Sequence, residues 1–308
     1  MWAFVLRRFL QSLLALIILS VVTFFFTWST GDPINYIVPL EETTPEQLEQ
    51  LRHEYGLDRP LLVQYWVYIK RVVQGDFGHA IHLGRRPVVD VIESRIIPTA
   101  HLGAMAIAMV LMFGIPLGVF AAYNRGRLFD SVARTVAFAG QSIPEFFLAL
   151  VLIFLVGVKL GWLPVAGREG GWQHWVLPAI TAGWFSTAGL LRITRSSVLE
   201  VLGSDYVRTA RAKGLMERTV LWRHTFRNSL ISIVTAIALL VVGLMHGIVL
   251  VETVFGWPGL GRLVVEAVTA RDLFLVQALV LLFGSMYLSA SLAADILYGV
   301  VDPRVRYS

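Results

Sequence analysis

The sequence predicts an all-α polytopic membrane protein with about six transmembrane helices. Of its 308 residues, 56% are hydrophobic and only 15% are charged, whereas a soluble domain usually carries about 25% charged residues. Lys and Arg gather beside the apolar stretches, which disfavours a nucleic-acid partner despite a pI near 9.7. Six segments supply the roughly 20 apolar residues that a membrane span needs: residues 9–29, 99–122, 133–158, 176–198, 230–251 and 273–299.

The first apolar segment is expected to be an uncleaved helix and not a secretory signal. Arg7 and Arg8 precede it, and it is longer than the apolar region of a typical signal peptide. Residues 31–33 follow it without a small-x-small cleavage site. The sequence contains no cysteine, which excludes disulfides, thiol catalysis and Cys-ligated metal.

Basic residues near the span ends predict that both termini are cytoplasmic. They precede the first span, follow the sixth, and lie between the second and third spans and between the fourth and fifth: Arg7, Arg8, Arg125, Arg127, Arg134, the basic residues of 203–230, Arg304 and Arg306. The opposite side then receives 30–98, 159–175 and 252–272. The first of these regions carries ten acidic and seven basic residues.

The predicted external region after the first span contains two helix signals, so we divide the chain into 1–98 and a membrane core at 99–308. Thr44 and Gln47 form a capping-box pattern around a first-turn proline, and the helix should stop at Gly56. A second helix should run from near Pro60 to near Gly75. One apolar stripe of this helix is expected to pack on the membrane domain, with contact to an external partner as the alternative: Leu62, Tyr65, Trp66, Ile69 and Val73.

Familiar catalytic patterns are missing from the sequence. No GxxxxGK[ST] phosphate loop and no GxSxG elbow occur, and the histidines lack metal-site spacing within a span. The Asp-Phe-Gly triplet at 76–78 lies in the predicted external region without the other kinase motifs. We therefore expect no nucleotide hydrolysis and no metal site in this chain.

Ionisable residues within spans are functional candidates, because each costs roughly 2.5–3.5 kcal/mol to insert at the bilayer centre. Three stand out: Glu145, His246 and Asp295. Glu145 follows a proline that can kink the helix, and with Ser142 it could line a translocation pathway. A pairing within the helix bundle is the alternative. Asp295 is expected to pair near the cytoplasmic end and His246 to lie in the core. Scattered groups of this kind disfavour an ion-coupled secondary transporter.

The predicted external loop 252–272 carries three closely spaced glycines around an aromatic segment. Gly256, Gly259 and Gly261 allow sharp backbone turns near Trp257. One interpretation is a re-entrant external gate, because non-helical backbone at membrane depth must be buried in protein or line a cavity. The alternative is an interfacial anchor, since Trp favours the membrane surface. The gate residues would be Phe255, Trp257, Pro258 and Leu260.

The most informative segment is the basic stretch 203–230, between two predicted spans. Ser204 or Asp205 can cap a short helix, and Gly214 suits the left-handed position that ends it. Helical spacing gathers one largely apolar face of Tyr206, Val207, Ala210 and Gly214, with Arg208 and Arg211 on the other. Such a helix could lie on anionic lipid or dock in a groove of a partner. A second helix should begin at Glu217.

This segment resembles the EAA loop of ABC importer permeases. Arg208-Thr209-Ala210 fall on the EAA triplet, and Ala210 and Gly214 match the pattern, whereas the glutamate and the final proline are absent. The form DYVRTARAKG followed by RH-x-x-RN is similar to the peptide/nickel branch of the family. Further segments with the same resemblance are 31–33, 55–60, 75–78, 114–118, 160–164, 251–261 and 302–304.

The resemblance implies a type I importer transmembrane fold with an extracytoplasmic helical insertion after helix 1. It implies a permease subunit in the cytoplasmic (inner) membrane that moves peptides or a similar small solute. The expected partners are a second homologous permease, two ATP-binding subunits and an extracytoplasmic solute-binding protein. ATP and Mg would bind the partner subunits, and this chain would bind no cofactor. An ion-coupled secondary transporter or a membrane scaffold remains the alternative. The residues expected to couple the chain to the ATPase subunits are Tyr206, Arg208, Thr209, Ala210, Arg211, Lys213 and Gly214.

Overall fold

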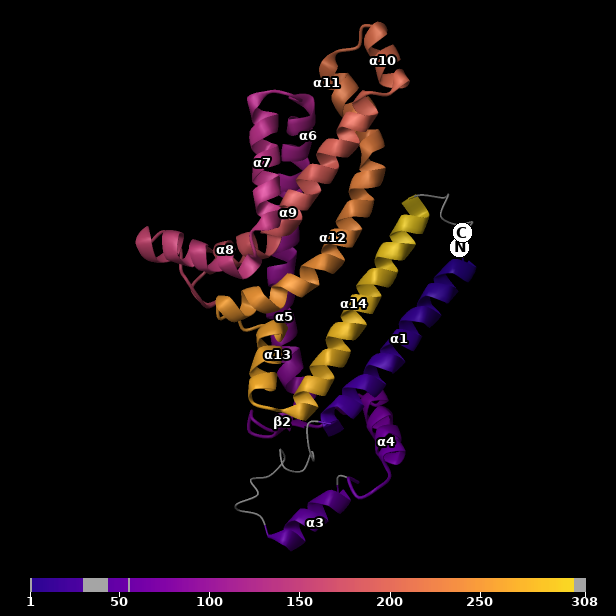
Figure 1. The fold of residues 1–308 in the computed structure, drawn as a ribbon, viewed down its shortest axis with the longest axis vertical. Helices are drawn as coiled ribbons and strands as arrows, with labels where there is room; N and C mark the ends of the chain where they lie inside the picture. Colours follow the sequence, from indigo (N-terminus) through magenta and orange to yellow (C-terminus); the bar gives the residue numbers. More distant parts are fainter. Residues whose placement is uncertain (1, 30–43, 55, 302–308) are drawn as a thin grey trace. The chain divides into compact units, whose positions relative to one another are not determined.

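The computed structural model describes residues 2–29, 44–54 and 56–301, and the regular secondary structure of this part is helical apart from one short hairpin (Figure 1). In chain order, the elements before residue 88 are α1 (Trp2–Ser29), α3 (Pro45–Glu54), α4 (Leu61–Val73), β1 (His79–Ala80) and β2 (Arg86–Pro87). The elements that follow are α5 (Val88–Met109), η1 (Val110–Gly114), α6 (Ile115–Tyr123), α7 (Leu128–Ser142), α8 (Glu145–Leu152), η2 (Ile153–Lys159), α9 (Gln173–Leu202), α10 (Asp205–Ala212), α11 (Glu217–Thr219), η3 (Val220–Phe226), α12 (Arg227–Val254), α13 (Leu260–Thr269) and α14 (Leu273–Val301). The η elements are π-helical.

The described helices bear out the prediction of about six spans. Five stretches are long and apolar enough to cross a membrane: Phe4–Thr27, Val88–Tyr123, Gln173–Leu202, Glu217–Leu244 and Leu273–Leu297. The second of these begins eleven residues before the predicted start at 99, because the helix continues through Pro98. The fifth predicted span likewise gains helical residues at its N-terminal end.

The third predicted span, residues 133–158, is not one continuous helix. α7 and the α8–η2 segment meet at an angle of 107°. Pro144 has no N–H group and disfavours helical geometry in the residue before it. Ile143 accordingly has φ −84° and ψ 121°, which is extended backbone, and α8 begins directly after the proline. The pair counts as a sixth span only if both arms belong to one crossing.

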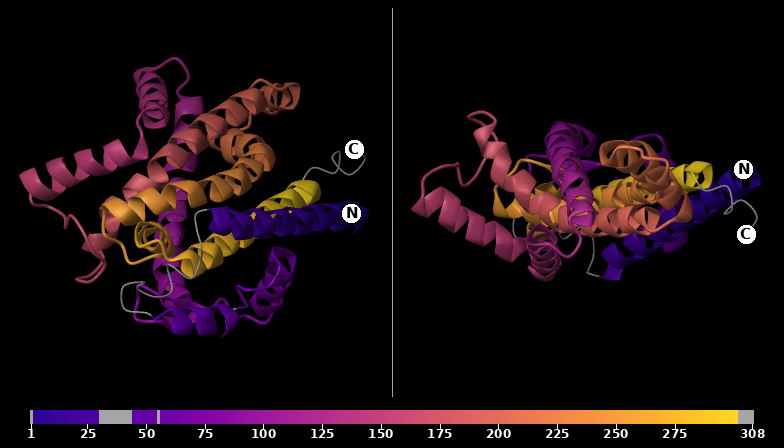
Figure 2. Two further views of the ribbon diagram at one scale, coloured as in Figure 1. Left: turned by 60° about the horizontal axis from the view of Figure 1, so that its bottom comes forward. Right: turned by 90° about the horizontal axis from the view of Figure 1, so that it is seen from above.

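One compact unit of the structure comprises Met1–Phe4, Thr99–Pro258 and Ala290–Ser308. Its centre is α9, which packs against α6, α7, α8 and α12, and α9 and α12 run side by side (Figure 2). Small residues allow this close packing, as is usual between membrane helices. Gly118 lies against Thr194, and Gly140 lies against Ala188, so that a methyl group at either glycine would collide with α9.

The other compact unit comprises Val5–Pro98 and Gly259–Ser289. β1 and β2 pair antiparallel within it, with Ala80 opposite Arg86. Gln277 of α14 donates a hydrogen bond of 2.7 Å to Thr27 of α1. Ten buried residues form the core of this unit: Ala80, Val88, Val91, Ile92, Leu260, Leu263, Ala267, Leu275, Ala278 and Leu279.

The predicted pair of short helices is present as α3 and α4. Thr44 and Gln47 exchange capping-box hydrogen bonds of 3.1 and 3.4 Å, and Gly56 and Gly75 end their helices with φ of +67° and +81°. The predicted packing stripe of α4 is only partly right. Its members Leu62, Trp66 and Val73 are exposed. Tyr65 of the same stripe does pack, because its ring meets that of Phe24 in α1 and its hydroxyl lies 2.8 Å from Ser20 Oγ.

Candidate functional site

The short basic helix predicted after Asp205 is α10, and it ends as the sequence indicates. Gly214 has φ +76°, a conformation that costs any residue with a β-carbon energy. Its N–H donates to the carbonyl of Arg211 at 2.9 Å, and the Leu215 N–H returns to Ala210. Ser204 occupies the N-cap position, but its hydroxyl donates to the Val201 carbonyl at 2.6 Å and does not cap α10. The predicted side-chain cap is therefore absent.

The apolar face of α10 is covered by the chain itself. Val207 has no exposed surface and Ala210 is 6% exposed, and both pack against Val220 together with Val201 and Leu202. The prediction that these residues form an apolar docking face for a partner is wrong in this respect, because the sheltering side chains come from the end of α9 and from η3. Val207 and Ala210 instead attach α10 to the membrane helices.

Side-chain hydrogen bonds reinforce that attachment at both ends of α10. Tyr206 donates to the His224 carbonyl at 3.3 Å, and the Asn228 amide donates to the Tyr206 hydroxyl at 2.9 Å. Arg211 forms a two-pronged ion pair with Glu217, with distances of 2.8 and 3.3 Å. The RH-x-x-RN pattern thus supplies partners for Tyr206, and α10 is held in a fixed orientation by groups on α11, η3 and α12.

The outward face of α10 is charged and accessible. Arg208, Thr209 and Lys213 are exposed, and Arg208 is 3.5 Å from Asp205 in a surface ion pair. Beyond Gly214, Leu215 and Met216 are exposed apolar residues, Met216 by 75%. Sequence reasoning missed these two. Their signal is an apolar pair within an otherwise polar loop.

The two predicted pathway residues lie on opposite sides of the α7–α8 break. Ser142 ends α7 and donates to the Phe138 carbonyl at 2.9 Å. Glu145 occupies the first turn of α8, where a carboxylate is favoured by the helix dipole. Its carboxylate lies directly against Gly247 of α12, so that a side chain at position 247 would displace it. Within the described residues, Glu145 has no hydrogen bond or ion pair, so the predicted pairing partner in the bundle is not found there.

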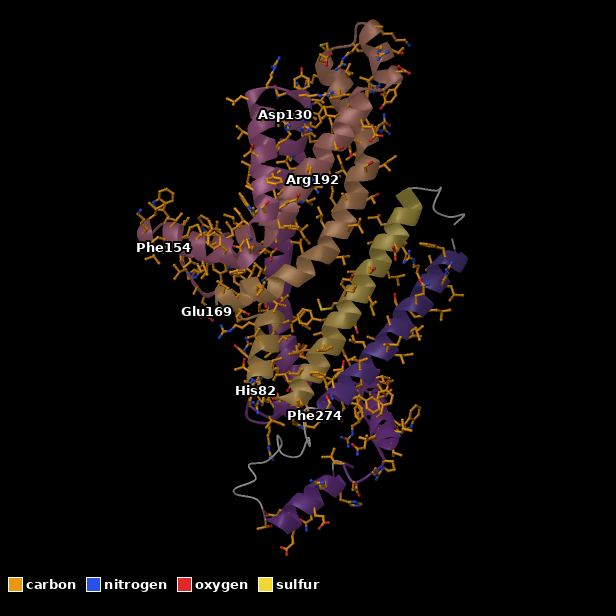
Figure 3. The ribbon with its side chains drawn as sticks, viewed as in Figure 1. His82, Asp130, Phe154, Glu169, Arg192 and Phe274 are labelled. Atoms are coloured by element: carbon orange, nitrogen blue, oxygen red, sulfur yellow. The ribbon has the colours of Figure 1, made fainter. Side chains whose placement is uncertain are left out.

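Two cations lie within the fourth predicted span, Arg192 and Arg195, and sequence reasoning counted neither among the ionisable residues of the spans. Arg195 of α9 holds Asp130 of α7 with bonds of 2.6 and 2.9 Å, and the side chain of Asp130 is 2% exposed. This pair ties α7 to the helix that leads into α10. Arg192 on the same helix is exposed and makes no hydrogen bond or ion pair with the described residues (Figure 3). Counting charges within the predicted span would have found both.

The predicted gate segment is buried. Phe255 and Trp257 have no exposed surface and lie in a cluster with Leu177 and Trp175. Arg168 lies over the Trp257 ring at 6.0 Å, and the Gly167 N–H donates to the Phe255 carbonyl at 2.9 Å. The anchoring interpretation is wrong for this conformation, because Trp257 presents no surface to lipid.

The remaining gate residues are placed by the same turn. Pro258 is half-buried, and Leu260 begins α13 within the core of the other unit. Gly256 has φ +61°, and the Trp257 N–H returns to the Glu252 carbonyl at 2.8 Å. The Glu252 carboxylate is itself fully buried and accepts a hydrogen bond of 2.6 Å from Thr99. Sequence reasoning missed Glu252 because it lies one residue beyond the predicted fifth span.

The described residues contain no group of three or more His, Asp or Glu that could hold a metal ion. What the arrangement offers is mechanical: an exposed basic helix fixed to long membrane helices, a sharp break beside an acid, and a buried aromatic turn.

Comparisons with known proteins identify this arrangement. The family model "Binding-protein-dependent transport system inner membrane component" matches residues 114–307, and its N-terminal companion matches residues 1–91. The chain is 42% identical over 305 residues to the glutathione transport system permease protein GsiC of Escherichia coli K12, covering 99% of both chains. The same protein of Shigella flexneri serotype 5b is also 42% identical, again over 99% of both chains.

Solved structures show the same fold. The MetNI methionine ABC transporter matches with a TM-score of 0.57 at 17% identity, over 69% of this chain and 96% of that chain. An amino acid ABC transporter matches with a TM-score of 0.52 at 16% identity, over 68% and 94%. The fold is the type I importer fold, and the family carries no ATPase activity of its own, since that activity lies in partner subunits. The chain belongs to the binding-protein-dependent inner membrane components and is a permease subunit of an ATP-driven ABC importer.

Proposed function

We propose that this permease subunit imports short peptides of the size class of glutathione. The full-length 42% identity to GsiC, whose name describes glutathione transport, supports this substrate class. The substrate carries free amino and carboxyl groups, so a pathway for it needs polar side chains at membrane depth. Glu145 and Arg192 supply one charge of each sign without partners among the described residues.

The outward face of α10 is the proposed docking surface for an ATPase subunit. Arg208, Thr209 and Lys213 are accessible there, while Leu215 and Met216 offer apolar surface beside them. Tyr206, Ala210 and Arg211 hold α10 on the membrane helices, and Gly214 ends it. A helix held in this way transmits a push as a rigid body, which is what gating by ATP-driven closure requires.

The proposed external gate is the buried turn at 255–260. Phe255 and Trp257 close it by packing against the 159–175 loop, and Arg168 covers Trp257. Opening the gate would separate these contacts and admit solute from the binding protein to a pathway past Ser142 and Glu145.

The proposed assembly contains a second homologous permease, two ATP-binding subunits that hold ATP and Mg, and an external solute-binding protein. The proposed location is the cytoplasmic (inner) membrane. The basic residues near the span ends favour the cytoplasmic side for both termini and for α10. Helices α3 and α4 would then face the binding protein.

Reconstitution tests the proposed substrate. The complete transporter should be reconstituted in proteoliposomes. It should accumulate radiolabelled glutathione, or another tripeptide, when ATP and the binding protein are present. Gly247→Leu should reduce that uptake at least tenfold, because the added side chain displaces Glu145. The same substitution at Gly243, which faces open space, should reduce uptake much less. Uptake of neither peptide, with ATPase activity intact, would exclude this substrate class.

A further inference from the structure

A cavity of about 170 Å³ lies in the unit that contains α4. One buried water needs only about 10–15 Å³ by this kind of volume. The cavity walls come from one face of α4, from Phe24 and Thr27 of α1, and from Phe274 and Gln277 at the start of α14. Figure 3 labels Phe274. The cavity is therefore large enough for a small solute.

Three polar side chains of α4 line this cavity in succession: Gln64, Tyr68 and Arg71. They are separated by four and three residues, so they share one face of the helix. The opposite stripe of α4 is apolar and exposed at Leu62 and Trp66. The polar face of α4 thus lines the cavity while its apolar face is exposed. This arrangement is the reverse of that in an ordinary amphipathic helix and calls for an explanation of the polar groups in the cavity wall.

Gln64, in the wall of the cavity, carries a buried hydrogen-bond acceptor without a partner. The residue is 8% exposed, and its Nε2 donates to the carbonyls of Leu57 and Arg59 at 3.1 and 2.7 Å. Its Oε1 has no partner. The amide cannot be turned over, because the oxygen would then face two carbonyl oxygens. The acceptor is thus fixed in place by the loop before α4 and left free.

Tyr68 supplies a free donor one turn further along. Its ring packs 5.5 Å from the ring of Phe24, and its hydroxyl is buried without a partner. Burial raises the pKa of Tyr68, so the hydroxyl keeps its proton at neutral pH. A buried polar group without a partner costs about 1–3 kcal/mol. Two such groups lie on one face of α4.

Charged groups of both signs complete the lining. Arg59 and Arg71 border the cavity, and the side chain of neither forms a hydrogen bond or ion pair with the described residues. Asp76 also borders it, with Oδ1 accepting from the Gly78 N–H at 2.9 Å. Unpaired guanidinium groups favour a carboxylate, while the nearby acid tolerates a positive charge.

We propose that this cavity binds a small zwitterion, an amino acid or short peptide, separately from the translocation pathway. Its carboxylate would meet Arg71 and Arg59, and an N–H group would donate to Gln64 Oε1. Tyr68 would donate its hydroxyl proton to an oxygen of the ligand. The proposal concerns binding at α4 and does not depend on which solute the transporter carries.

Binding of radiolabelled alanyl-alanine to the full chain in lipid nanodiscs tests this site. Saturable binding at one site per chain is expected, with competition by unlabelled alanine and none by N-acetylalanine methylamide, which has no charge. Tyr68→Phe should weaken binding about tenfold, in line with the loss of one hydrogen bond to a charged group. Arg71→Gln should weaken it at least as much.

Matched variants separate a binding role from a structural one. Tyr65→Phe removes a hydroxyl that bonds Ser20 outside the cavity, and Lys70→Gln removes a charge that does not line it. Both should bind as the parent chain does. Tyr68→Phe should leave thermal stability unchanged or raise it, because its hydroxyl has no protein partner to lose.

Three results would overturn the proposal: no saturable binding, equal competition by the neutral analogue, or unchanged affinity in Tyr68→Phe and Arg71→Gln. Failure of the transport assay with intact binding would count against the proposed substrate and leave this site standing.

Discussion

The loop that contains α10 and the turn at 255–260 are built from similar parts but differ in what they bury. Each follows a long helix and reverses at a glycine with positive φ, +76° at Gly214 and +61° at Gly256. The α10 loop keeps its charged groups in water and buries only Val207 and Ala210. The 255–260 turn buries Phe255 and Trp257 completely.

Under the proposed function, this contrast separates a surface that would dock from a seal that would open. The outward face of α10 can meet a partner without disturbing its own attachment, because different residues serve the two purposes. Opening the turn would expose Phe255 and Trp257, and each large apolar side chain costs about 1.5–3 kcal/mol to bring into water. If the turn is the gate that we propose, it would open only when the transport cycle supplies free energy.

The largest effect is expected where α10 attaches to the membrane helices. Ala210→Glu would place a charge in the small core against Val220 and detach α10, so transport should be abolished. The same substitution at exposed Ala212 is the control for added charge. Trypsin should cut after Arg211 or Lys213 at least tenfold faster in Ala210→Glu than in Ala212→Glu. Equal cleavage rates would mean that the buried face does not hold α10.

Removing the aromatic seal should reduce transport less than detaching α10 does. It should also lower the thermal stability of the protein by a measurable amount. Trp257→Ala leaves a cavity among Trp175, Leu177 and Phe255, and such changes typically cost about 3–5 kcal/mol. Trp162→Ala is the control, because that side chain is 71% exposed. Thermal unfolding in detergent should show a large loss for the first and a small one for the second. Similar losses would contradict the buried seal.

The smallest effect is expected at the end of α10. Gly214→Leu forces a left-handed backbone on a branched side chain, at a cost of about 1–2 kcal/mol. Transport-coupled ATPase activity should fall about tenfold, since a strained end shifts the docking surface. Gly214→Asn should stay close to the parent, because asparagine tolerates this conformation. If the two variants behaved alike, the glycine would not be needed for its backbone.

Much of this architecture could be predicted from the sequence because it depends on local rules. The capping residues around Thr44, the helix stops at Gly56 and Gly214, and the break before Glu145 each follow from the conformational limits of one or two residues. The apolar spans follow from composition. These features require no knowledge of distant contacts.

The features that were not predicted all depend on tertiary contacts between segments that are far apart in the sequence or between a helix and whatever packs on it. An amphipathic helix shows an apolar face whether its own chain or a partner covers it, so the burial of Val207 could not be separated from docking. The same ambiguity placed Trp66 of α4 on the packing face, although its side chain is exposed. The pairing of Asp130 with Arg195 joins residues 65 positions apart, and no local pattern specifies such a contact.

Single cysteines at positions 209 and 210 test the central claim that α10 docks by its outward face, in a chain that has no other cysteine. Thr209 is exposed and Ala210 is buried. Modification by a soluble maleimide would be timed in the permease alone and in the complete transporter. Thr209→Cys should react readily in the permease alone and be protected at least tenfold when the ATPase subunits are bound. Ala210→Cys should react slowly in both. Equal reactivity of Thr209→Cys with and without the ATPase subunits, in a transporter that still hydrolyses ATP and imports, would contradict docking through this face.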